Sequence, residues 1–107
     1  MVSLKIQPAV KEFVIEEYGE QGLKVLNKAV EKMDSMMRWK DSPSEVSKMM
    51  DGSFQVKGAN ILKKYVNGSQ QAWRMAIKRI SEEVYAVEMF ASKKDEDLLL
   101  RKLQKKF

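Results

Sequence analysis

Apolar residues recur along most of this chain at intervals of three and four, the spacing that places side chains on one face of an α-helix. This pattern predicts helices over 8–18 and 21–39, with a break at Gly19, which can adopt the left-handed conformation that ends a helix. A stripe as wide as that of the second helix is typical of packing on a globular core. Its main positions are Leu23, Leu26, Val30, Met33 and Met37.

The second part of the chain shows the same spacing, which predicts helices over 43–50, 54–66, 70–91 and 93–107. The helix over 70–91 is the longest, and its apolar positions advance by four and three residues in alternation. These positions are Trp73, Ile77, Ile80, Val84, Val87 and Ala91. No stretch reads as a strand of alternating polarity. We therefore expect an all-α fold: a single compact bundle of five to six helices with a long central helix near residues 70–91.

Two of these helices begin at recognisable capping patterns. Ser42 is followed by Pro43 and, three residues after the serine, by Glu45. A serine cap, a proline in the first turn and a glutamate at the third position together mark a helix start. Ser92 and Asp95 repeat the spacing before the last helix, so we interpret the acidic residues from Asp95 onward as a helix start and not as a metal site.

The length of 107 residues corresponds to one domain, 1–107, and its apolar content of 44% suits a folded core. The chain has no cysteine and no histidine. It therefore lacks disulfides, thiolate nucleophiles and the usual general base near neutral pH. We expect a non-enzymatic protein with no catalytic residues, no bound metal and no cofactor. An enzyme that works with carboxylates alone remains an alternative.

The sequence also bears on location. Residues 1–8 show no basic segment that leads into an apolar one, so no signal peptide is expected. The longest apolar runs have three residues, far from the roughly 18 that a bilayer span requires. We expect a cytoplasmic protein without membrane insertion.

The net charge of +5 is unevenly distributed. Residues 1–53 carry a net charge of −1 and residues 54–107 one of +6. The 30 residues between Asp51 and Glu82 include no acidic side chain. Such a basic segment is the pattern that contacts nucleic-acid phosphates, so we predict DNA or RNA binding through the basic 54–81 region. The predicted contacts are Lys57, Lys63, Lys64, Arg74, Lys78 and Arg79.

Two other interpretations stay open. The basic residues are equally compatible with a solvated face that keeps the protein in solution. Alternatively, the chain is a protein-interaction module, a helical adaptor or a homo-oligomeric bundle. That module would use its Met-rich surface around Trp39 or the amphipathic helix at the C-terminal end. The residues predicted for this interface are Trp39, Met36, Met37, Leu99, Leu103 and Phe107.

Overall fold

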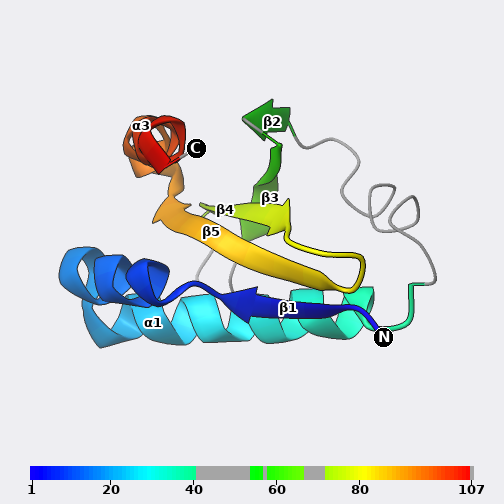
Figure 1. Ribbon diagram of the computed structural model, residues 1–107. Helices are drawn as coiled ribbons and strands as arrows, with labels where there is room; N and C mark the ends of the chain where they lie inside the picture. The colour runs from blue at the N-terminus through cyan, green and yellow to red at the C-terminus, as the bar shows by residue number, and fades with distance from the viewer. Residues whose placement is uncertain (41–53, 57, 67–71, 107) are drawn as a thin grey trace.

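The computed structural model describes residues 1–40, 54–56, 58–66 and 72–106, which form a central sheet between two helices (Figure 1). The sheet has five strands in the order β1-β5-β4-β3-β2. Strand β1 is parallel to β5, and the other neighbours are antiparallel. The strands are β1 (Ser3–Ile6), β2 (Phe54–Val56), β3 (Ala59–Val66), β4 (Ala72–Arg79) and β5 (Val84–Ser92). The helices are α1 (Pro8–Met37) and α3 (Glu96–Lys106), the latter preceded by a 3-10 turn, η1 (Lys93–Asp95).

The prediction of an all-α bundle of five to six helices is wrong, because this is an α/β fold. The long central helix expected near 70–91 is the hairpin of β4 and β5, and the helix expected over 54–66 is the pair β2 and β3. The helix predicted over 43–50 lies outside the described residues. The C-terminal helix is present, since η1 and α3 occupy 93–106.

The strands were missed because helices cover both faces of the sheet. In β5, every residue from Tyr85 to Ser92 is buried, so this strand lacks the alternation of a sheet with one solvated face. A continuous apolar run satisfies helical spacing by chance. In β4, Trp73, Met75 and Ile77 do alternate with basic or small residues, which is the pattern of a strand, although the same residues also fit helical spacing. The hairpin turn, residues 80–83, has no glycine, proline or asparagine to mark it.

Each face of the sheet has its own core. Helix α1 packs on one face through a cluster that includes Val14, Leu26, Met75 and Phe90. Helix α3 packs on the opposite face, where the buried side chains are Ile61, Ala76, Met89, Ala91, Leu99 and Leu103. Burial of these apolar surfaces, at about 25 cal/mol per Å², is the main force that holds the helices on the sheet.

The break predicted at Gly19 is confirmed. Gly19 has φ 67° and ψ −163°, a conformation that side-chain-bearing residues rarely adopt, and it interrupts α1. Gly22 allows the close approach that this bend requires, because a Cβ atom there would lie 2.3 Å from Tyr18 Cβ. Figure 1 shows the consequence: the first part of α1 leads away from β1, and the longer second part returns along the sheet.

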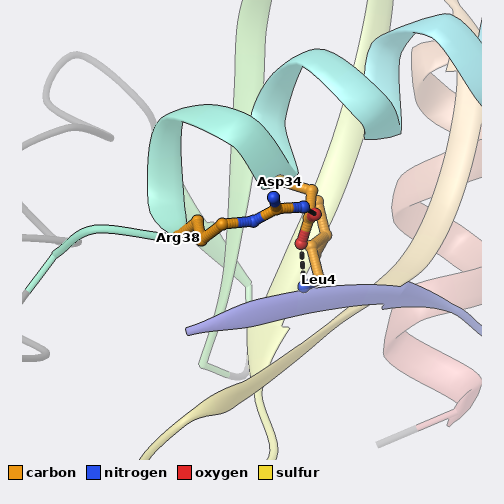
Figure 2. A network of polar contacts seen from close by, with 3 residues as sticks. All are labelled: Leu4, Asp34 and Arg38. Carbon is orange, nitrogen blue, oxygen red and sulfur yellow. Dashed lines mark hydrogen bonds and ion pairs between the residues drawn. The ribbon is translucent and has the colours of Figure 1, made fainter. Parts of the chain in front are cut away.

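The returning helix also protects the edge strand β1. The backbone N–H of Leu4 donates to Asp34 Oδ1 over 2.8 Å, and Arg38 Nη2 donates to Asp34 Oδ2 over 3.1 Å (Figure 2). The N–H of Val2 donates to the carbonyl oxygen of Arg38 over 3.4 Å. A free strand edge is a template for pairing with other chains, so these bonds block one such edge.

Candidate functional site

Arg74, a predicted phosphate contact, is turned toward the interior. It lies on the face of β4 that α3 covers, and only 7% of its surface is exposed. Its Nε donates to Glu96 Oε2 over 3.2 Å, an ion pair that joins the strand to the first turn of α3. The structure therefore gives Arg74 a positioning role for α3 and does not present its guanidinium on the surface.

The other predicted cations of β4 do not share one surface. Lys78 is half-buried on the same face as Arg74, whereas Arg79 follows it directly and so points to the opposite face. Arg79 is exposed, and its Nε donates to the carbonyl oxygen of Ser81 over 3.1 Å. In a strand, Arg74 and Lys78 lie roughly 13 Å apart, not on successive helical turns as the sequence had suggested.

The remaining predicted cations cannot be placed. Lys57 lies outside the described residues, and Lys63 and Lys64 belong to β3 but their side chains are outside the description. Of the six predicted phosphate contacts, the structure therefore places three side chains, and it does not bring these three together.

The predicted protein interface is likewise divided. Trp39 and Met36 are exposed at 74% and 47%, respectively, near the end of α1. Met37 is fully buried in the core between α1 and the sheet. The remaining residues belong to the last helix: Leu99 and Leu103 are fully buried on the sheet, and Phe107 lies outside the described residues. The apolar stripe of α3 is thus occupied within its own chain.

In the described segment 93–105, which comprises η1 and most of α3, exposed basic residues outnumber exposed acidic ones, because two of its acidic residues bond within the protein. Asp95 Oδ2 accepts from Tyr18 Oη over 2.5 Å and from Ser92 Oγ over 3.1 Å. Glu96 pairs with Arg74. Asp97 is then the exposed acidic residue of the described segment 93–105. Its exposed basic residues are Lys93, Lys94, Arg101, Lys102 and Lys105.

Tyr18 connects this segment to the bend of α1. Its hydroxyl oxygen accepts from the backbone N–H of Ser92 over 3.0 Å, and Ser92 precedes η1 without a capping hydrogen bond from its own side chain. Burial raises the pKa of the Tyr18 phenol, and its hydrogen bond to Asp95 raises the pKa further. The Tyr18 ring also makes an edge contact with Trp73, 5.0 Å between centroids. The folded protein therefore stabilises the neutral form of the Tyr18 phenol.

We use the name α3 basic surface for Arg101, Lys102 and Lys105. On a helix, Lys105 is a neighbour of both Arg101 and Lys102, because it follows them by four and three residues. All three side chains are exposed. In the sequence these cations form only the polar side of an amphipathic helix, because the inward turn of Asp95 and Glu96 depends on contacts with distant residues.

A groove of about 320 Å³ adjoins this surface. It runs between the first turns of α1 and the C-terminal part of α3, with β5 as its floor. The ammonium group of Lys102 lies 5.1 Å from the centroid of the Phe13 ring. The lining residues are Ala9, Val10, Phe13, Glu88, Met89, Lys102 and Lys105.

Glu88 is the one acidic residue among those that line the groove, and it is 4% exposed. It occupies an irregularity in the sheet: Ala76 pairs with Met89 and Ile77 with Val87, so Glu88 is an extra residue in β5. Such a β-bulge changes the direction in which a side chain points. Gln7 Nε2 donates to Glu88 Oε1 over 3.4 Å.

No protein-family model, curated protein or solved structure matches this chain. Within the part of the chain that the structure describes, neither helix contains an apolar stretch long enough to cross a bilayer. The α3 basic surface and the groove beside it are therefore the features of the molecule that bear on its function.

Proposed function

We propose that this protein binds nucleic acid without catalysing a reaction, and that the α3 basic surface contacts the phosphate backbone. The observation that carries the proposal is the inward use of Asp95 and Glu96, which leaves five exposed cations and one exposed acidic residue over 93–105. Contacts of this kind neutralise phosphates and release counterions, and they do not read sequence. A cytoplasmic location is part of the same proposal.

The three cations of the basic 54–81 region whose side chains are described contribute less than the sequence suggests. Arg74 is committed to Glu96, and Arg79 lies on the other face of β4 from Lys78. Lys78 is the placed member of the predicted set that lies on the same face of the sheet as α3. We therefore assign the main phosphate contacts to α3, and Lys78 to the periphery of the same surface.

The test is binding of a labelled DNA duplex and a labelled single strand, measured by fluorescence anisotropy over a range of salt concentrations. We expect affinity to fall steeply between about 50 and 200 mM salt. Replacing Arg101 and Lys105 together by glutamate should abolish binding at moderate salt and reduce the salt slope by about 2. Absence of binding at about 50 mM salt would overturn the proposal.

A matched control comes from the outer face of α1. Lys28 and Lys32 are exposed and four residues apart, as Arg101 and Lys105 are. The pair Lys28→Glu and Lys32→Glu changes net charge by the same amount on a different surface. We expect this variant to keep most of the affinity. If both charge-reversed pairs lose binding equally, the effect is one of net charge, and the assignment to α3 is wrong.

A second candidate function is self-association, which Trp39 and Met36 favour. A tryptophan exposed at 74% beside an exposed methionine is typical of an interface anchor. Sedimentation of the full chain should show a dimer or larger species that Trp39→Ser converts to monomer. Ile15, also on α1 and 47% exposed, supplies the control Ile15→Ser. A monomer at all concentrations would eliminate this candidate.

A further inference from the structure

Exposed apolar side chains gather at one end of the molecule. Among the described residues, the large apolar side chains that are between 47% and 74% exposed are Met1, Ile15, Met36, Trp39 and Ile80. All of these except Ile15 belong to residues 1–3, to the end of α1 or to the turn between β4 and β5. Single apolar residues are common on protein surfaces, whereas a group of them indicates contact with a partner.

Backbone hydrogen bonds hold these three segments side by side. The N–H of Val2 donates to the carbonyl oxygen of Arg38 over 3.4 Å, and the N–H of Ser3 donates to that of Glu83 over 2.8 Å. Residues 1–3 therefore lie between the end of α1 and the turn, as Figure 1 also shows. We use the name α1 end surface for the exposed residues Met1, Met36, Trp39, Arg79, Ile80 and Glu82.

The charges of the α1 end surface have both signs. Arg79 and Glu82 are exposed and three positions apart at the turn. Arg79 Nε donates to the carbonyl oxygen of Ser81, which uses one of the five N–H groups of the guanidinium. Glu82 repels a nucleic acid or an anionic membrane. A second copy of the same surface is complementary, because a twofold axis brings each residue of such a pair opposite the other residue of the partner.

We propose that two copies of this chain associate through the α1 end surface about a twofold axis. The apolar side chains around Trp39 form the centre of the contact, and Arg79 of each copy pairs with Glu82 of the other. Side chains make this contact, because Asp34 closes the neighbouring edge of β1 by accepting the N–H of Leu4. The inference rests on the self-association given above as the second candidate function, and it adds the interface and its symmetry.

The α3 basic surface is not part of this contact. Lys102 of α3 lies over the ring of Phe13, in the first turns of α1, whereas Trp39 follows the last turn of the same helix. The part of α1 after the bend, residues 22–37, has a length of roughly 24 Å at 1.5 Å per residue. Nucleic-acid binding and self-association therefore use different surfaces and can be tested independently.

Charge reversal tests the pairing of Arg79 with Glu82, with the full chain studied by sedimentation velocity over a range of concentrations. In Arg79→Glu only glutamates face one another across the axis, and in Glu82→Arg only arginines do. Each variant alone should dimerise at least about tenfold more weakly than the wild type, because like charges meet. An equimolar mixture of the two variants should recover most of the lost affinity, since every arginine again faces a glutamate.

Matched variants control for charge and for apolar area. Lys28→Glu and Glu31→Lys make the same charge changes at exposed positions of α1 and should leave the dimer unchanged. Ile80→Ser should weaken dimerisation by about fivefold or more, whereas Ile15→Ser, before the bend of α1, should not. Far-UV circular dichroism measures whether each variant is folded. If a charge-reversed variant is not, the comparison of Ile80→Ser with Ile15→Ser decides the matter.

The outcomes separate this inference from self-association itself. If the wild type dimerises but neither charge reversal weakens the dimer, or if the mixture does not recover, the inference is overturned and self-association stands. If the full chain is monomeric at all concentrations, both fail, and the α1 end surface contacts a partner of another kind. Binding of DNA by Arg101 and Lys105 is measured separately and is untouched by either result.

Discussion

Asp34 accepts the backbone N–H of Leu4 over 2.8 Å and thereby fastens the second part of α1 to the outer edge of β1 (Figure 2). The two residues are 30 positions apart in the sequence, so the bond joins strand β1 to the last turns of helix α1. Arg38 holds the other carboxylate oxygen in place. A side chain thus does for this strand edge what a neighbouring strand does inside the sheet.

Asp34→Ala should lower the free energy of unfolding by about 1–3 kcal/mol, because it leaves the partly buried N–H of Leu4 without its acceptor. Asp34→Asn keeps an acceptor oxygen and should lose less than half as much. Urea unfolding followed by circular dichroism measures both. The alanine variant should also associate at high concentration through the opened edge of β1. Equal stability of the alanine and wild-type proteins would contradict this role.

Removal of the ion pair between Arg74 and Glu96 should also lower the free energy of unfolding. Glu96→Ala leaves the guanidinium of Arg74 in a buried site without this partner, and we expect a loss of about 1–3 kcal/mol, since Glu96 itself is partly exposed. Changing both residues, Arg74→Met with Glu96→Ala, should recover part of that loss. A double-mutant cycle by urea unfolding measures the coupling. If the two effects simply add, the ion pair does not hold α3 on the sheet.

The bend of α1 depends on its two glycines for different reasons. Gly19→Ala should cost about 1–3 kcal/mol because of its backbone conformation, although a Cβ there meets nothing within 4 Å. Gly22→Ala should cost a similar amount by overpacking against Tyr18, with a normal backbone. Gln21→Ala, between them and exposed, is the control and should change stability little. Thermal unfolding should show lower stability for both glycine variants than for Gln21→Ala. If Gly22→Ala leaves the stability unchanged, the close approach of Gly22 to Tyr18 does not constrain the helix.

Tyr18 makes stability depend on alkaline pH. Its raised pKa means that the folded chain favours the neutral phenol. This stabilisation is complete below 10.0, the ordinary value, and is lost as the pH rises through the higher pKa of the folded state. Burial raises the pKa of Tyr85 as well, so it contributes in the same direction.

Tyr18→Phe isolates the first of these contributions. Urea unfolding between pH about 8 and about 11, which spans the usual tyrosine pKa, should show wild-type stability falling more steeply than that of the variant. At the lower pH the variant should already be less stable by about 1–2 kcal/mol, because Ser92 and Asp95 lose a hydrogen-bond partner. Parallel curves would show that Tyr18 ionises as freely in the folded chain as in the unfolded one.

The sequence by itself predicts the structure of residues 1–40 correctly, with the exception of the four-residue strand β1. Helix α1 lies on the sheet with one face and exposes lysine and glutamate on the other, so its period of 3.6 residues is visible in the sequence. The bend at Gly19 was also readable, because few residues other than glycine adopt its backbone angles. The start of the last helix followed from serine and acidic residues at its first turn.

Only the tertiary structure decided the sheet and the surface of the protein. Strand β5 carries apolar side chains toward both helices, which hides the period of two on which strand prediction depends. The basic residues that reach solvent were equally hidden in the sequence. Arg74 is paired inside the protein with Glu96, 22 residues away, and the carboxylate of Asp95 is bonded to Tyr18, 77 residues away. Which charged residues of the sequence form a charged surface therefore depends on which of them are paired in the folded structure.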